Sequence, residues 1–230
     1  MPYALFKIWI LLIEITKRNS STYSEKHFLT NLPINPDMEI VFATNNLYKI
    51  EEVQHLLNNN FQLLSLNDIG CNEELPETGN TLEENAKQKA RYVSETCKVD
   101  CFADDTGLEI EILNGRPGVL SARYAGEEKN SDKNIEKVLF EMKNSLNRTA
   151  CFKTIISFII SNKEHQFEGI VNGTISKEKK GEKGFGYDPI FVPKGFNKSF
   201  AEMSLDEKNK ISHRAIAVKK LADFLNALKS

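Results

Sequence analysis

The sequence Phe102-Ala-Asp-Asp-Thr-Gly-Leu108 places two adjacent carboxylates, Asp104 and Asp105, directly after an apolar run. The run from Val99 predicts a buried strand, and we expect the aspartates at its end, with Gly107 in the turn that follows. Neighbouring carboxylates repel each other, and an unpaired one is costly to bury. The pair therefore calls for a cation, and hard oxygen ligands favour magnesium. An Asp-rich turn would explain the same residues from backbone preference alone, so this stretch leaves both interpretations open.

The composition is that of an ordinary globular enzyme, with 40% hydrophobic and 27% charged residues in a chain of 230. A formal net charge of −2 argues against a nucleic-acid partner, which usually requires a strongly basic surface. The cysteines include no C-x-x-C pair, so we expect reduced thiols and a cytoplasmic protein. They are Cys71, Cys97, Cys101 and Cys151.

The first 37 residues differ from the rest of the chain. Ala4–Ile13 is apolar apart from Lys7, and a polar stretch follows. About ten apolar residues are too few to cross a bilayer, and no signal-peptide cleavage site is clear, so we expect no membrane partner. Met38 directly precedes the first predicted strand. We therefore interpret residues 1–37 as an extension outside the fold, or as the result of a start codon assigned too early, and residues 38–230 as the folded domain.

A strand over 39–43, a polar loop and a helix from Leu47 follow one another in the sequence. This order places Thr44, Asn45 and Lys49 around a helix N-terminus, where backbone N–H groups and the helix dipole favour phosphate. The glycines of a Walker loop are absent. A capped helix with a surface lysine explains the same residues without a ligand, so the pattern alone does not decide between them.

The remaining periodicity predicts a mixed α/β fold. Two long apolar segments, 149–161 and 166–176, are expected to form a hairpin, which makes the sheet mixed rather than purely parallel. A helix is expected from the capping sequence at Thr81, after a loop in which Glu77 is a candidate metal ligand. Other expected elements are strands over 61–66 and 108–113 and a helix over 131–146.

Two segments near the C-terminus suggest recognition of a flat ligand. Glycines flank Phe185, whose ring could stack on a base, and Asp188 could accept a ring N–H, although a Phe in a tight turn is more often part of the core. Ser212 fits the N-cap of the last helix. Two potentially cationic residues, His213 and Arg214, then stand in its first turn, where cations are unfavourable, and this cost suggests a function.

Six segments together resemble the inosine triphosphate pyrophosphatase family. They occur in the family's order and spacing over residues 38–230, and six matches in order are far more specific than any one of them. The matching segments are Thr44-Asn45-Asn46-Leu47-Tyr48-Lys49, Glu77-Thr78-Gly79, 103–108, 115–126, Phe185-Gly186-Tyr187-Asp188-Pro189 and Ser212-His213-Arg214.

The resemblance implies an elongated mixed sheet with flanking helices, forming two lobes around a nucleotide cleft. It also implies a homodimer that requires Mg²⁺ and acts on a purine nucleoside triphosphate. Glu77 and Asp105 would bind the metal, and Asp105 would be the base for the attacking water. The implied substrate contacts are Thr44, Asn45, Asn46, Leu47, Tyr48 and Lys49 for the triphosphate, Thr106 where the family usually has Ser, and Phe185, Gly186, Tyr187, Asp188, Lys208, His213 and Arg214 around the purine.

The implied reaction is hydrolysis of non-standard purine nucleoside triphosphates (ITP, dITP and XTP) to the monophosphate and pyrophosphate. Hypoxanthine and xanthine present an acceptor oxygen at position 6, which donors on His213 and Arg214 would meet. Adenine presents an amino group there and would leave buried donors unpaired. The alternatives are a related pyrophosphatase of different base preference and a non-catalytic nucleotide-binding module, which would not need Glu77 and Asp105 together.

Overall fold

The computed structural model describes residues 39–57, 61–71 and 73–228. The extension expected over residues 1–37 lies outside these residues, so it stays a prediction. Within the described residues, no helix combines the length and the apolar character needed to cross a membrane.

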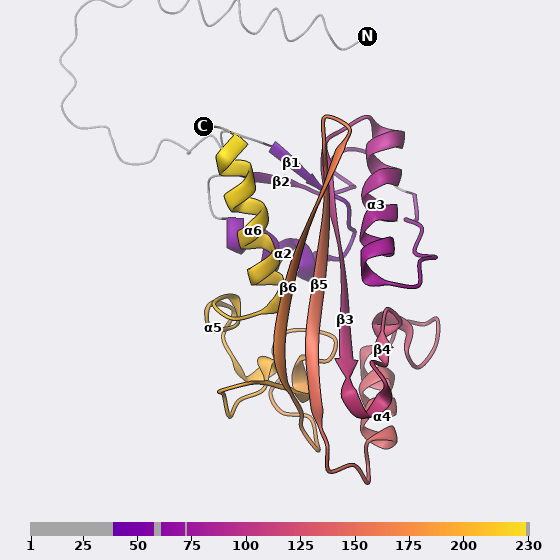
Figure 1. The fold of residues 1–230 in the computed structure, drawn as a ribbon, viewed down its shortest axis with the longest axis vertical. Coiled ribbons are helices and arrows are strands. Elements are labelled where there is room, and N and C mark those ends of the chain that lie inside the picture. Colours follow the sequence, from indigo (N-terminus) through magenta and orange to yellow (C-terminus); the bar gives the residue numbers. More distant parts are fainter. Residues whose placement is uncertain (1–38, 58–60, 72, 229–230) are drawn as a thin grey trace, which may run out of the picture. The chain divides into compact units, whose positions relative to one another are not determined.

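A seven-stranded mixed sheet forms the centre of the fold, as the sequence predicts (Figure 1). Its strands lie in the order β2-β1-β3-β5-β6-β7, and β4 pairs with the far end of β3. The first three strands are parallel and the others join antiparallel. The strand bounds are Glu39–Phe42 (β1), Gln62–Leu64 (β2), Cys101–Ile110 (β3), Pro117–Gly118 (β4), Thr149–Ile160 (β5), Lys163–Ile175 (β6) and Phe191–Pro193 (β7).

Strand β3 runs straight through the aspartate pair, so the expected turn at Gly107 is wrong. Asp105 pairs with Ile155 of β5, and the pairing continues to Ile110. Gly107 is required for a different reason: a Cβ there would lie 2.6 Å from the carbonyl oxygen of Gly118 on β4. The separate strand expected over 108–113 is therefore the end of β3 followed by a 3₁₀ turn.

The long hairpin of β5 and β6 is confirmed, with a tighter turn than expected. Ile160 pairs with Lys163, so the connection is only Ser161 and Asn162. Both have positive φ, 48° and 63°, which is the geometry of a two-residue turn that matches the twist of the strands.

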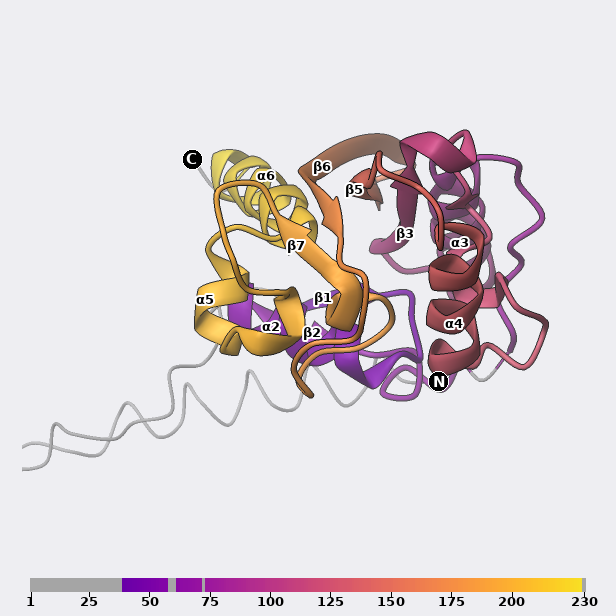
Figure 2. The same ribbon diagram turned by 90° about the horizontal axis from the view of Figure 1, so that it is seen from below.

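Helices cover both faces of the sheet. Figure 2 shows α3 and α4 on one side and α6 on the other, in agreement with the packing of α3 on β3 and β5 and of α6 on β5 and β6. The helix bounds are Leu47–Leu57 (α2), Leu82–Cys97 (α3), Ser131–Glu141 (α4), Leu205–Asn209 (α5) and His213–Leu228 (α6). Thr81 caps α3 as predicted, whereas α4 ends five residues earlier than expected, at Glu141 rather than residue 146.

The hydrophobic core follows the alternation of side chains along β3. Phe102 packs on Phe42 with the helices α2 and α6, while Cys101 and Ala103 pack on the opposite face with α3. A further cluster around Leu108, at the other end of the long strands, packs with α4 and β7. The core is thus divided along the sheet, as expected for two lobes.

Candidate active site

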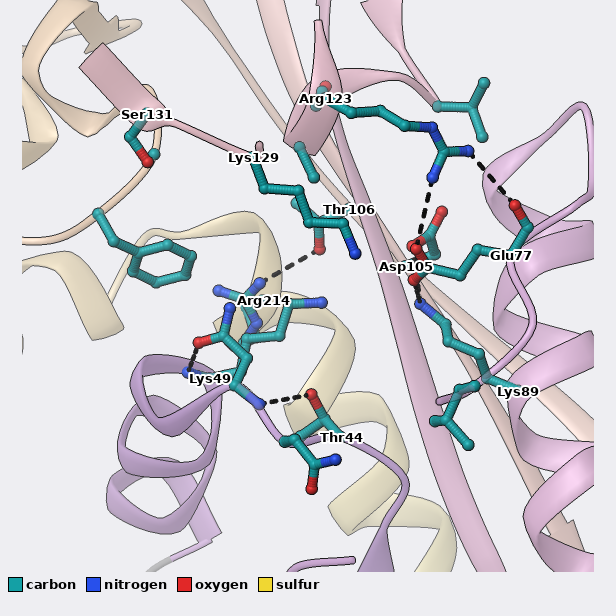
Figure 3. A pocket seen from close by; sticks show the side chains of 18 of the residues that line it. Thr44, Lys49, Glu77, Lys89, Asp105, Thr106, Arg123, Lys129, Ser131 and Arg214 are labelled. Carbon is teal, nitrogen blue, oxygen red and sulfur yellow. Dashed lines mark hydrogen bonds and ion pairs between the residues drawn. The ribbon is translucent and has the colours of Figure 1, made fainter. Parts of the chain in front are cut away.

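A cleft of about 960 Å³ lies beside the middle of β3, between the loop after β1 and the segments that carry Arg123 and Phe185 (Figure 3). Leu47 and Tyr48 do not line it, and they are 74% and 60% exposed. The predicted site residues that do line it are Thr44, Asn45, Asn46, Lys49, Glu77, Asp105, Thr106, Phe185, Gly186, Tyr187, Asp188, Lys208, His213 and Arg214.

The two adjacent aspartates point to opposite faces of the sheet. Successive side chains alternate along a strand, so Asp104 follows Phe102 to the face of α2 and α6, and Asp105 follows Ala103 to the face of α3. The repulsion expected from their adjacency is therefore relieved by the backbone, and each carboxylate has cations of its own.

Asp104 is held by two buried cations. Its Oδ1 accepts a hydrogen bond of 2.6 Å from Lys49, and its Oδ2 accepts two of 3.2 Å from the Nε and Nη2 atoms of Arg214. Burial alone would raise the pKa of Asp104, but the charges of Lys49 and Arg214 hold it well below its usual range. Lys49 is thus no surface lysine, which removes the simpler interpretation of the segment.

The backbone N–H groups at the start of α2 are partly used by the loop itself. Asn46 Oδ1 accepts from the N–H of Lys49 at 3.2 Å, and Thr44 Oγ1 accepts from the N–H of Asn46 at 3.2 Å. The expected phosphate site at this helix N-terminus therefore has fewer free N–H donors than the sequence suggests. The polar side chains of the loop are the groups that face the cleft.

Glu52 extends this charge network, and sequence reasoning missed it. The buried carboxylate accepts from Arg214 Nη1 and, at 2.6 Å, from Lys208 Nζ. Lys208 also contacts Asp188 at 2.6 Å. Arg214, Glu52, Lys208 and Asp188 therefore form a continuous buried chain. Its signal in the sequence is the position of Glu52 three residues after Lys49, on the same helix face.

The ring of Phe185 lies near one aromatic side chain and two cations. Tyr48 stacks on it with centroids 5.4 Å apart, while Lys208 Nζ and Arg214 Cζ lie 5.2 and 5.6 Å from its centroid. The loop is held by Asp188, whose Oδ2 accepts from the Phe185 N–H at 2.9 Å. Gly184 is required here, because it has a φ of +73° and a Cβ would lie 2.1 Å from that oxygen.

His213 is a neutral side chain at the cleft. Burial, together with the charges of Arg214 and Lys208, lowers the pKa of His213 well below its usual value. The expected cost of a cation at the start of α6 therefore falls on Arg214 alone, whose charge is offset by carboxylates. His213 stacks on Phe152 at 4.5 Å, and its Nδ1 is buried without a hydrogen-bond partner among the described residues. This orphaned atom is free for a ligand in the cleft.

Thr106 lies at the junction between β3 and the charge network. Its hydroxyl is 2.7 Å from that of Thr154 on β5 and accepts from Arg214 Nη2 at 3.2 Å. The hydroxyl that the family usually supplies from Ser is thus present and directed toward Arg214, and the extra methyl group leaves both contacts in place.

On the opposite face, Lys89 joins the two predicted metal ligands. Its Nζ lies 2.7 Å from Glu77 Oε1 and 2.8 Å from Asp105 Oδ1. Asn85 donates to Asp105 Oδ2 at 3.4 Å, and Arg123 Nη1 lies 3.8 Å from Glu77 Oε2. Sequence reasoning missed Lys89, Asn85 and Arg123. The spacing of the first two, four residues apart on the buried face of α3, is the signal that was available.

The pKa values of Asp105, Glu77 and Lys89 are shifted in different directions. Burial raises the pKa of Asp105, and the Glu77 charge adds to the rise although Lys89 opposes it. Burial also favours the neutral form of Glu77, but the charges of Lys89, Lys49 and Lys129 together outweigh that effect and lower the pKa of Glu77. The pKa of Lys89 is raised, because its carboxylate partners outweigh its own burial.

Glu77 and Asp105 are oxygen ligands of the kind that a divalent cation prefers, and in this structure the Lys89 ammonium lies between them. Magnesium is commonly held by one or two carboxylates together with substrate phosphates. Among the residues that the structure describes, no group of three or more His, Cys, Asp or Glu side chains could hold a metal ion. Glu77 and Asp105 alone would not enclose a metal ion, and a Mg²⁺ held by them would need further oxygen ligands such as phosphates.

Known proteins resemble this chain in both sequence and fold. A sequence profile of the Ham1 family matches residues 40–224. A Flavobacterium psychrophilum protein named dITP/XTP pyrophosphatase is 55% identical over 187 residues, which cover 81% of this chain and 98% of that protein. A Bacillus subtilis protein of the same name is 49% identical over 193 residues, covering 82% and 98%. The Ham1 protein structure from Staphylococcus aureus superposes with a TM-score of 0.75 at 39% identity, covering 82% of this chain and 98% of that one.

Proposed function

The chain belongs to the Ham1 family, and we propose that it hydrolyses ITP, dITP and XTP to the monophosphate and pyrophosphate. It is a nucleoside-triphosphate pyrophosphatase, because relatives that it matches over nearly their whole length are named dITP/XTP pyrophosphatase. The observation that carries the proposal is the division of Asp104 and Asp105 between two faces of β3. One carboxylate belongs to the Arg214 network beside Phe185, and the other to the Glu77 and Lys89 cluster.

We assign base selection to the face of β3 that carries Asp104. We assign Phe185 to stack on the purine, and Arg214 and the neutral His213 to meet the oxygen at position 6. His213 Nδ1 is buried and has no partner among the described residues, so an adenine amino group would leave it unpaired, and such a mismatch discriminates strongly. Asp188 and Glu52 fix Lys208 and Arg214, so the donors are already oriented before a nucleotide binds.

We assign hydrolysis to the face of β3 that carries Asp105. We assign Asp105 to position the water that attacks the α-phosphorus and to accept its proton, with Lys89 beside the developing charge. The α–β phosphoanhydride bond then breaks, and pyrophosphate leaves. Glu77 and Asp105 would hold Mg²⁺, which when bound supplies positive charge that offsets the phosphate oxygens. Thr44, in the loop after β1, and Lys49, in the first turn of α2, are assigned to the triphosphate.

Magnesium dependence, a homodimer and a cytoplasmic location complete the proposal. Magnesium dependence is supported by the oxygen ligands that Glu77 and Asp105 offer to a cation shared with the substrate phosphates. The family resemblance supports the second, and sedimentation of the purified chain at twice its 26.1 kDa mass would be the expected result. A cytoplasmic location is consistent with the free cysteines of the chain, Cys71, Cys97, Cys101 and Cys151.

The test is pyrophosphate release from ITP, XTP, dITP, ATP and GTP, with magnesium and with a chelator. We expect kcat/KM for ITP and XTP to exceed that for ATP by about a hundredfold or more, and Asp105→Asn to abolish turnover. Asp132→Asn, an exposed residue of α4, serves as the matched control. Equal turnover of all five nucleotides would contradict the base-reading role, and binding without turnover would favour a non-catalytic module.

A further inference from the structure

Lys129 lines the cleft and forms no ion pair with an acidic side chain of the described residues. Among the described residues that line the cleft, every other lysine and arginine forms an ion pair, namely Lys49, Lys89, Arg123, Lys208 and Arg214. Within the same described residues, Lys129 has no such partner. Figure 3 shows its side chain directed into the cleft from the loop before α4.

The backbone at Lys129 is fixed although its side chain is exposed. Its N–H donates to the carbonyl of Gly126 at 3.4 Å, and Asn130 caps α4 by accepting from the Lys133 N–H at 3.0 Å. Asn134 Oδ1 also accepts from the N–H of Ala125 at 2.7 Å. The loop is therefore attached to α4 on both sides of Lys129, and this attachment keeps the ammonium within reach of the cleft.

Local conformational preference does not explain a lysine at this position. Lys129 has a φ of 52°, a left-handed conformation that glycine adopts freely and asparagine tolerates better than long side chains do. A residue kept against its local preference is commonly found where a site requires it. The long cationic side chain, rather than the turn, is thus the feature to be explained.

The position of Lys129 indicates which part of the substrate it meets. Figure 3 shows the Lys129 side chain extending toward Asp105, and its charge acts on the Glu77 carboxylate, so it lies on the hydrolytic side of the cleft. With the purine on Phe185, as in the proposed function, the triphosphate would extend toward that side. Because the other cations are already paired with carboxylates, Lys129 is the one among the described lining residues that offers an uncompensated charge to phosphate oxygens.

We propose that Lys129 binds the terminal phosphates of the substrate, the part that leaves as pyrophosphate. This inference rests on the proposed function and adds to it a residue for the leaving group. Lys129 would favour triphosphates over shorter nucleotides and would stabilise the charge that develops on the departing pyrophosphate.

The test compares Lys129→Met with Lys129→Arg and with the control Lys133→Met, a lysine of the same segment that pairs with the exposed Glu128. Steady-state kinetics with ITP and magnesium is combined with product inhibition by pyrophosphate and by IMP. Calorimetric titration with pyrophosphate measures binding without turnover. A charged hydrogen bond of this kind is worth about tenfold or more in binding.

We expect Lys129→Met to weaken ITP and pyrophosphate binding about tenfold while IMP inhibition changes less than about twofold, and Lys129→Arg to retain most of the affinity. Equal weakening of IMP and pyrophosphate would show a structural role and overturn the proposal, as would unchanged pyrophosphate binding. If the wild-type chain failed to hydrolyse ITP, the proposed function would fail, and the calorimetric titration would still decide the role of Lys129.

Discussion

Glu52→Gln tests whether the buried charge network holds the base-reading residues in place. The substitution keeps the size of the side chain but removes the charge that Arg214 and Lys208 share. Glu52 is only 5% exposed, and both cations are fully enclosed as well. Breaking a buried pair by neutralising one partner typically costs about 3–5 kcal/mol, because the other charge stays buried and unpaired.

We therefore expect the free energy of unfolding to fall by about 3 kcal/mol or more, and kcat/KM for ITP to fall with it because Arg214 loses its fixed orientation. Urea unfolding with an unchanged m-value measures the first effect, and pyrophosphate release the second. Glu51→Gln, the exposed neighbour on the same helix, is the control and should change stability by less than about 0.5 kcal/mol. A loss in Glu52→Gln no larger than in this control would refute the reasoning.

Two further predictions concern β3 and His213. Gly107→Ala places a methyl group 2.6 Å from the Gly118 carbonyl oxygen, so we expect a loss of about 1–3 kcal/mol in thermal unfolding; an unchanged melting temperature would contradict the close approach of β4. The lowered pKa of His213 means that the unfolded chain takes up a proton below about pH 6.5 while the folded chain does not, so stability falls by up to about 1.4 kcal/mol per pH unit in that range. Urea midpoints at pH 7.5 and 5.5 should show a smaller acid loss in His213→Gln than in the wild-type chain, and equal losses would count against a neutral His213.

Much of the fold was predictable from periodicity, because the long elements have strong local signals. The β5–β6 hairpin and the start of α6 at Ser212 are examples. The turn at Gly107 was predicted wrongly, because glycine permits a turn and also permits a close approach of two strands. Only the position of Gly118 in space distinguishes the two, and β4 is far too short to be recognised by its own pattern.

The site residues that belong to recognisable motifs were predictable. Those that reach the cleft only because of how the helices and strands pack were not. Arg214 and Phe185 were found from their local sequence and from the resemblance. Lys89, Glu52 and Lys129 were not found, because a charged residue on a helix or in a loop usually faces solvent. Their roles depend on which face of an element meets the cleft. That information comes from the sheet order and from the side on which each helix crosses, and neither is written in the local sequence.

Because Asp104 and Asp105 alternate along β3, this strand also fixes the distance between the residues assigned to the base and those assigned to hydrolysis. The two carboxylates belong to consecutive residues of a central strand, whose rise of about 3.3 Å per residue does not vary with loop motion. A nucleotide whose base is held out of place by about 1 Å therefore carries its α-phosphorus out of place by a similar distance, and misplacement of this size can cost about a hundredfold in rate. We expect discrimination against wrong bases to be expressed in kcat as well as in KM, because the strand transmits a misfit at one face directly to the other.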